Sequence, residues 1–209
     1  MAFFLRAKHW QLFLLSFGIP FILQLFLVFD VVTSITSHAD PTFMLAYFKF
    51  FPILLVVFIG TLFGWFWAVG VGLQKMVPSV IKMKVTTFKV FFFIPLAYLL
   101  LIAIGMGMLF SNSFFGNITS SNNPAPFFIG FAVIFPLHIF SMFCIFYCLY
   151  FSARTIKTIE LQRPVTFSDF AGEFFLIWFF FIGVWIIQPR INKMTSPEGD
   201  VNLVSDQID

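Results

Sequence analysis

The sequence predicts an all-α protein, a polytopic integral membrane helix bundle. Of its 209 residues, 60% are hydrophobic and only 10% are charged, and Phe alone occurs 36 times. The 12 Lys and Arg and the 9 Asp and Glu side chains are too few to give a soluble domain of this size a polar shell. The apolar runs show no alternation of polarity, so they predict helices and not the strands of an outer-membrane barrel. We therefore expect a surface that contacts membrane lipid.

Five hydrophobic segments divide the chain. A helix needs about 20 mostly apolar residues to cross a hydrocarbon core of ~30 Å. Four runs have this length and contain no Lys, Arg, Asp or Glu: 10–29, 50–73, 90–110 and 127–151. A fifth segment, 170–188, contains Glu173 near its start, and we expect it either to span or to enter and leave on one side. Residues 1–194 thus form the predicted transmembrane domain, followed by an acidic C-terminal tail at 195–209.

The distribution of Lys and Arg predicts the orientation, because cytoplasmic loops retain these residues. Nine of the 12 cations lie in the N-terminal tail and in the loops after the second and fourth segments: Arg6, Lys8, Lys75, Lys82, Lys84, Lys89, Arg154, Lys157 and Arg163. The N-terminus is therefore predicted to be cytoplasmic. The side of the C-terminal tail stays open, because it depends on whether the fifth segment spans.

Small residues recur every four positions on the second segment, at Gly60, Gly64, Ala68 and Gly72. This spacing places them on one helix face, where another helix backbone can approach closely in lipid. The sequence predicts a helix-packing surface and leaves open whether the neighbour is a helix of the same chain or of a partner.

The fourth segment carries most of the polar residues that we expect inside the membrane. A helical arrangement places one strip on about a third of the circumference: His138, Ser141, Cys144, Cys148 and Ser152. An intramembrane histidine is a candidate for a proton or ion path, and the alternative is a polar helix contact. Gln24 on the first segment is expected to bond to another helix. We predict no metal site, because one His and two Cys leave a zinc ion without a further ligand.

The loop between the second and third segments is basic, with Lys75, Lys82, Lys84 and Lys89. Anionic lipid headgroups are its expected partner, and an acidic cytoplasmic protein is the alternative. Asp169 and Glu173, near the start of the fifth segment, are interpreted as complements to a helix dipole.

Motifs for common catalytic mechanisms are absent from the sequence. It contains no HExxH, GxSxG, GxxxxGK[ST] or GxGxxG run, so we expect neither an enzyme nor a bound cofactor. A net charge of +3 argues against nucleic-acid binding.

The last quarter of the chain contains the runs Phe167-Ser168-Asp169 and Gln188-Pro189-Arg190-Ile191-Asn192. Together with the Phe-rich composition, it resembles uncharacterised small inner-membrane proteins of Bacteroidota. The resemblance implies a bacterial inner-membrane location and no particular activity. We interpret Pro189 as the end of the fifth helix.

These observations favour a non-enzymatic accessory or assembly subunit of a larger inner-membrane complex, which acts through helix packing and loop and tail contacts. The alternative function is a small transporter or channel component that uses the polar strip on the fourth segment.

Overall fold

The computed structural model describes residues 2–36, 43–109 and 125–196. Within these residues every regular element is a helix, as the sequence predicted. The chain begins with α1 (Ala2–Arg6) and α2 (His9–Phe13), which continues through the π-helical turn η1 (Leu14–Gly18) into α3 (Ile19–Thr36). The next helix is α4 (Phe43–Trp67), extended by the π-helical turn η2 (Ala68–Gly72) and the 3-10 turn η3 (Leu73–Met76). The remaining helices are α5 (Val85–Leu109), α7 (Ala125–Leu161), α8 (Phe167–Trp178) and α9 (Phe180–Met194).

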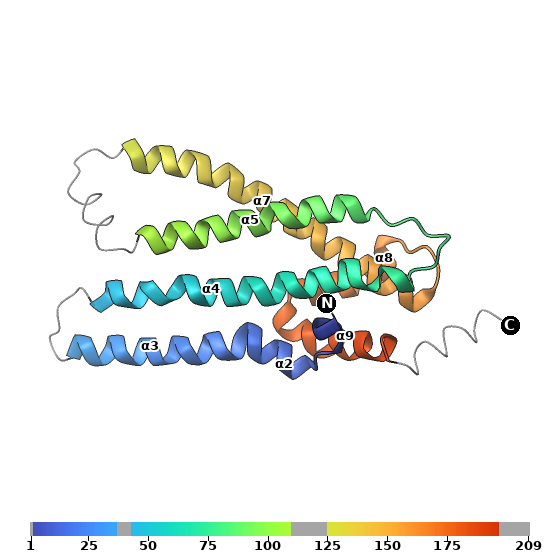
Figure 1. Cartoon of the computed structure of the whole chain (residues 1–209), viewed down its shortest axis with the longest axis horizontal. Coiled ribbons are helices and arrows are strands. Elements are labelled where there is room, and N and C mark those ends of the chain that lie inside the picture. The colour runs from blue at the N-terminus through green and yellow to red at the C-terminus, as the bar shows by residue number, and fades with distance from the viewer. Residues whose placement is uncertain (1, 37–42, 110–124, 197–209) are drawn as a thin grey trace.

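Four helices in the described residues are long and apolar enough to cross a membrane: His9–Asp30, Pro52–Met76, Val85–Met106 and Gly130–Leu161. They run back and forth along the long axis of the molecule (Figure 1). One end of this bundle holds the turns at 77–84 and 162–166 and the short helices α1, α2, α8 and α9. We call it the hairpin end, after the hairpin that α8 and α9 form.

The fifth hydrophobic segment does not form one continuous helix. It is divided between α8, of 12 residues, and α9, of 15 residues, which correspond to lengths of ~18 and ~22 Å. The backbone turns at Phe179, with φ −88° and ψ 55°, and the two helices pack against each other as a hairpin. Our interpretation of Pro189 as a helix end is wrong, because α9 continues through it to Met194.

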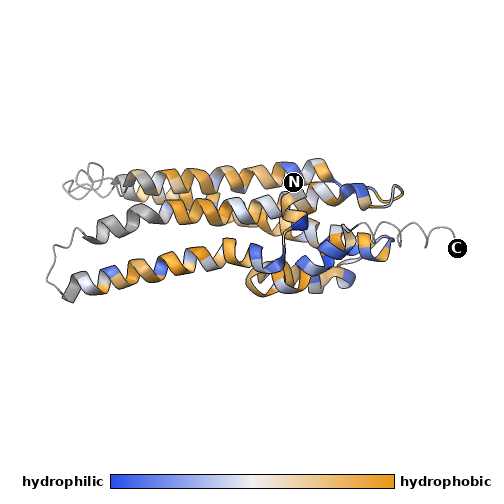
Figure 2. Cartoon of the chain, turned by 60° about the horizontal axis from the view of Figure 1, so that its bottom comes forward, coloured by the Kyte–Doolittle hydropathy of each residue, from blue (hydrophilic) through white to orange (hydrophobic). Residues whose placement is uncertain are grey.

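The fourth helix is longer than its apolar run indicated. α7 extends to Leu161, so Arg154 and Lys157 lie on its last turns and not in a loop. A 37-residue helix is ~55 Å long, well beyond the ~30 Å of a hydrocarbon core. Hydrophilic residues of α7, α8 and α9 collect at the hairpin end, whereas the rest of the long helices is mostly hydrophobic (Figure 2).

The core also lies toward the hairpin end. Trp65 of α4 packs against Phe180 with ring centroids 5.2 Å apart, and Phe88 of α5 stacks on Phe151 of α7 at 4.7 Å. At the other end α7 has few neighbours, and all ten residues of 131–140 are exposed. Among the described residues, the core thus lies at the hairpin end, and α7 is exposed over 131–140 toward the other end.

The hairpin depends on a close approach at Gly183. A Cβ added there would lie 1.7 Å from the backbone oxygen of Leu176, a distance that no small shift of a side chain relieves. A Cβ added at Gly172 on α8 would have no neighbouring atom within 4 Å.

We predict that Gly183→Ala separates α8 from α9 and lowers the free energy of unfolding by about 2 kcal/mol or more, as overpacking does. Gly172→Ala is the matched control and should stabilise the protein by up to about 1 kcal/mol, because Ala favours a helix. Unfolding by SDS in mixed micelles measures both. Equal effects of the two substitutions would contradict the close approach.

Candidate functional site

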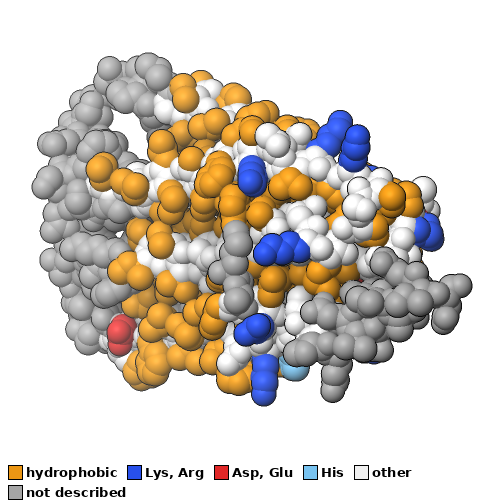
Figure 3. Space-filling view, turned by 45° about the vertical axis from the view of Figure 1, so that its right-hand side comes forward, with side chains coloured by type: hydrophobic (Ala, Val, Ile, Leu, Met, Phe, Trp, Pro, Cys, Tyr) orange, Lys and Arg blue, Asp and Glu red, His pale blue; other side chains and the backbone are white. Residues whose placement is uncertain are grey.

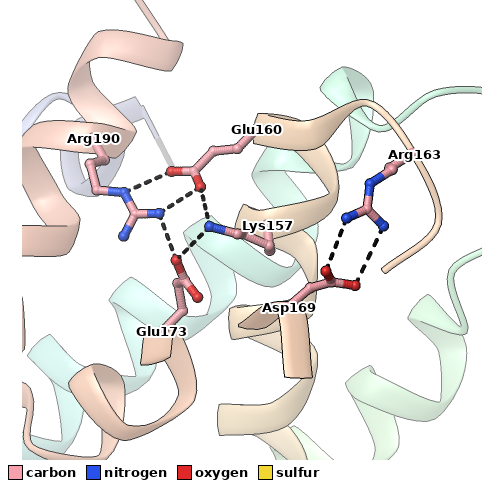
Figure 4. A network of polar contacts seen from close by, with 6 residues as sticks. All are labelled: Lys157, Glu160, Arg163, Asp169, Glu173 and Arg190. Carbon is pink, nitrogen blue, oxygen red and sulfur yellow. Dashed lines mark hydrogen bonds and ion pairs between the residues drawn. The ribbon is translucent and has the colours of Figure 1, made fainter. Parts of the chain in front are cut away.

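A cluster of four charged side chains joins the C-terminal hairpin to α7 (Figure 4). Arg190 of α9 donates from Nε and Nη2 to the two carboxylate oxygens of Glu160, at 2.7 and 2.5 Å. The same Nη2 donates to Oε1 of Glu173 on α8 at 2.7 Å. Lys157 Nζ lies 3.1 Å from that Glu173 oxygen and 3.4 Å from Oε2 of Glu160. We name these residues the charge cluster; three helices supply it, and two cations balance two carboxylates.

The carboxylate of Glu173 is the most buried member, with 7% of its side chain exposed. Burial alone would raise its pKa, but hydrogen bonds from Arg190 and Lys157 outweigh that and lower the pKa below its usual value. Hydrogen bonding to Glu160 raises the pKa of Arg190, so both partners stay charged. A buried charge without its partner is far more costly than the intact pair, so the cluster fixes the hairpin on α7.

A second ion pair closes the turn between α7 and α8. Arg163 donates from Nη2 to Asp169 Oδ1 at 2.9 Å, and the backbone N–H of Thr166 donates to Asp169 Oδ2 at 2.7 Å. These bonds lower the pKa of Asp169 to about 2, with the Arg163 side chain as the main cause. Asp169 therefore caps α8 and also joins it to the preceding turn.

Gln188 of α9 joins the N-terminal segment to the hairpin. Its side chain is fully buried. Trp65 Nε1 donates to its Oε1 at 2.8 Å, and its Nε2 donates to the carbonyl oxygens of Phe4 and Ala7, both at 2.9 Å. Since an indole nitrogen only donates, Trp65 determines which end of the amide faces it. The Oδ1 atom of Asn192 also accepts from Nε2 of Gln188, at 3.0 Å. The Nδ2 atom of Asn192 donates to the Ala7 carbonyl oxygen at 3.1 Å.

The sequence interpretation missed this site. It explained Asp169 and Glu173 by the helix dipole, noted Gln188 only as the first residue of the run 188–192, and assigned no role to Glu160. Glu173 and Arg190 bond to each other although 17 positions separate them in the sequence. The turn at Phe179 brings their two helices side by side and so makes this contact possible. The available signal was a pair of charged residues at the fifth segment, Glu173 within it and Arg190 just after it. Charged residues in such places are rarely left unpaired, so an ion pair between them could have been predicted.

An apolar cleft of about 420 Å³ lies beside the turn of the hairpin. Its walls come from η1, α4 and α7 and include Phe17, Phe58, Met142 and Ile145, and residues 177–181 of the hairpin also line it. A smaller cavity of about 350 Å³ between η1–α3 and α4 is lined by Ser16, Gln24 and apolar side chains. Both cavities share Phe17 and Phe58, so they are neighbours.

The small residues of the second segment have different surroundings. An added Cβ at Gly64 would lie 2.5 Å from the ring of Phe4, and one at Gly72 would lie 3.2 Å from Leu5, so α1 packs here. Ala68 is fully buried, whereas Gly60 has open space. Gly64, Ala68 and Gly72 therefore pack against other residues of this chain.

The polar strip of α7 is mostly internal. Four of its members have at most 2% exposure: Ser141, Cys144, Cys148 and Ser152. His138 is exposed, and its Nδ1 lies 3.0 Å from the Tyr98 hydroxyl of α5. Both cysteines are free thiols. In the part of the chain that the structure describes, no three His, Cys, Asp or Glu side chains are grouped to hold a metal ion.

The four lysines of the basic loop are all exposed: Lys75, Lys82, Lys84 and Lys89. Lys75 belongs to η3 and Lys89 to the second turn of α5, so the structure distributes this loop over two helix ends. Lys89 Nζ lies over the ring of Trp67, 5.9 Å from its centroid. The tail, apart from residues 195 and 196, lies outside the described residues.

We predict that Gln188→Leu lowers the free energy of unfolding by about 2 kcal/mol or more, because it leaves the Trp65 N–H and the Phe4 carbonyl buried without partners. Combining it with Trp65→Phe, which removes the donor, should cost less than the sum of the two single substitutions. SDS unfolding in mixed micelles measures this cycle. Strict additivity would mean that the two side chains do not interact.

Acid should weaken the attachment of the hairpin. A carboxyl group with a lowered pKa stabilises the folded state above its unfolded pKa, and this contribution is lost as pH falls through the folded value. Stability should therefore decrease as pH falls below the usual 4.5 of Glu173 and the usual 3.8 of Asp169, toward about 2.

Arg190→Met should raise the pKa of the Glu173 carboxyl relative to the unmodified protein, because one of the hydrogen bonds that oppose the effect of burial is lost while that of Lys157 remains. The deficit in thermal midpoint relative to the unmodified protein should be largest near neutral pH and shrink in acid. Lys193→Met, at an exposed cation without an ion pair among the described residues, is the control and should follow the unmodified protein at every pH. A deficit independent of pH would contradict the role of the charge cluster.

Comparison with protein-family models, curated proteins and solved structures finds no match to this chain. The resemblance of its last quarter to inner-membrane proteins of Bacteroidota stays a prediction.

Proposed function

We propose that the chain is a non-enzymatic accessory subunit of a larger complex in a bacterial inner membrane, and that its cleft receives a transmembrane helix of a partner. The observation that carries this proposal is the exposed stretch of α7 that continues from the apolar cleft. All ten residues of 131–140 on α7 are exposed, and at 3.6 residues per turn they cover every direction around the helix.

The location of the cleft supports a helical partner. Its lining is almost entirely apolar, and the turn of the hairpin contributes one side of it. A helix that packs between α4 and α7 would contact Phe58, Met142 and Ile145. Between apolar helices in lipid, such an association is driven by van der Waals packing.

The hairpin end supplies rigidity for this task. The charge cluster and Gln188 connect α7, α8, α9, α4 and the N-terminal segment through hydrogen bonds. In the proposed arrangement this end lies at the cytoplasmic face, in accord with its Lys and Arg residues. The long helices then extend from a fixed base, and a partner helix fills the space between them.

The alternative function, a transporter or channel component that uses the polar strip, has less support. Ser141, Cys144, Cys148 and Ser152 are buried, and the one ionisable residue of the strip at the open end, His138, already contacts Tyr98.

Site-specific photocrosslinking in intact bacterial cells tests the proposal. A photoreactive amino acid at Met142, which lines the cleft, should form a discrete adduct with one membrane protein. The adjacent Phe143, exposed but not in the cleft lining, is the matched control and should give no such adduct. Adducts with lipid alone at both positions would contradict a partner helix.

A further inference from the structure

The described cations fall into two classes. Lys157, Arg163 and Arg190 form ion pairs. Eight other Lys and Arg side chains that the structure describes form none: Arg6, Lys8, Lys75, Lys82, Lys84, Lys89, Arg154 and Lys193. They belong to α1, the turn before α2, η3, the 77–84 turn, the start of α5 and the ends of α7 and α9, all toward the hairpin end. We name these eight residues the cationic end surface.

The carboxylates at this end are engaged inside the protein. Glu160 and Glu173 are held by Arg190 and Lys157, and Asp169 is held by Arg163. Asp30, on α3, is the other acidic residue whose side chain the structure describes. In Figure 3, Lys and Arg side chains are spread over the hairpin end on the face in view, and no acidic side chain is seen among them. Among the described residues, this surface therefore carries eight cations and no carboxylate that is free to pair with them.

Apolar side chains are exposed between these cations. Val80, in the 77–84 turn between Lys75 and Lys82, is 86% exposed, Phe3 is 62% exposed and Trp10 is 47% exposed. Exposed apolar groups next to cations suit the boundary between lipid headgroups and acyl chains, where both find partners. A soluble acidic protein would satisfy the cations and leave Val80 in water.

Arg154 differs from the other members of the surface. Its side chain is half-buried near the end of α7, and its Nε, which is itself buried, has no hydrogen-bond partner among the described residues, so only the outer N–H groups can reach a ligand. Arg163 and Arg190 at the same end of the bundle each have a carboxylate. The planar guanidinium group suits phosphate oxygens, which can accept from two of its N–H groups.

We propose that the cationic end surface binds the headgroups of anionic phospholipids, with Val80 and Trp10 between the acyl chains and Arg154 toward a phosphate. This inference rests on the membrane insertion proposed above and does not depend on the partner helix. Each cation near an anionic membrane contributes about a fivefold preference, so several together select anionic over zwitterionic lipid.

The test uses the purified full-length chain in a neutral detergent, with phosphatidylglycerol or phosphatidylcholine of equal chain length added. Thermal unfolding and native mass spectrometry report lipid binding. Phosphatidylglycerol should raise the unfolding temperature and stay bound, and its effect should shrink in high salt, because screening shortens the Debye length from ~10 Å at 0.1 M to ~3 Å at 1 M. Equal responses to both lipids would overturn the proposal.

Substitutions separate charge from folding. Lys75, Lys82 and Lys84 are exposed, so replacing all three with Gln should leave the unfolding temperature without lipid unchanged and lower the affinity for phosphatidylglycerol by about a hundredfold, at about fivefold per cation. Replacing the same three with Arg keeps the charge and should retain the affinity. If the Gln variant responds to phosphatidylglycerol as strongly as the unmodified chain, the proposal is overturned. It is also overturned if the chain binds a soluble polyglutamate peptide and shows no effect of phosphatidylglycerol.

Flotation with phosphatidylcholine vesicles keeps the two proposals distinguishable. A chain that co-floats with these neutral vesicles is inserted independently of the cationic end surface. The preference for phosphatidylglycerol then tests the cationic end surface, and the adduct at Met142 tests the partner helix.

Discussion

The contact on which the rest of the structure depends is the one between Arg190 and two carboxylates, Glu160 of α7 and Glu173 of α8. Charges in such surroundings persist only when they are paired, because removing one partner leaves the other uncompensated where water is scarce. The helices that carry them are therefore held at one mutual position. Gln188, on the same helix as Arg190, extends the connection to Trp65 and to the backbone of the N-terminal segment.

The hairpin turns at Phe179 and, with α8 only 12 residues long, ends partway along the bundle, so it fills the space between the long helices at one end only. The same turn bounds the apolar cleft beside Met142, and on α7 all ten residues of 131–140 are exposed, although His138 contacts Tyr98 of α5. A fifth segment that spanned as one helix would have closed this space. The division of that segment into two short helices is thus what makes a partner helix a reasonable occupant in our proposal.

The charge cluster also affects the outer surface. It engages Glu160 and Glu173 internally, and Arg163 engages Asp169 in the same way. The exposed lysines at this end therefore have no acidic neighbours to neutralise them among the described residues. One set of internal ion pairs thus supports both proposals, because it fixes the hairpin beneath the cleft and leaves the cationic end surface without a described carboxylate to pair with.

The sequence by itself determined the helical class and the four long apolar helices, because a run of about 20 apolar residues has few alternatives when every backbone polar group needs a partner. Two features were decided only by the tertiary structure. The helix breaks at Phe179, where the sequence has no Gly or Pro that would predict it. Helix α9 continues through Pro189 because Gln188, Arg190 and Ile191 are held by neighbouring parts of the chain. The charge cluster was equally hidden, since its members meet only after the turns at 162–166 and 179 have brought three helices together.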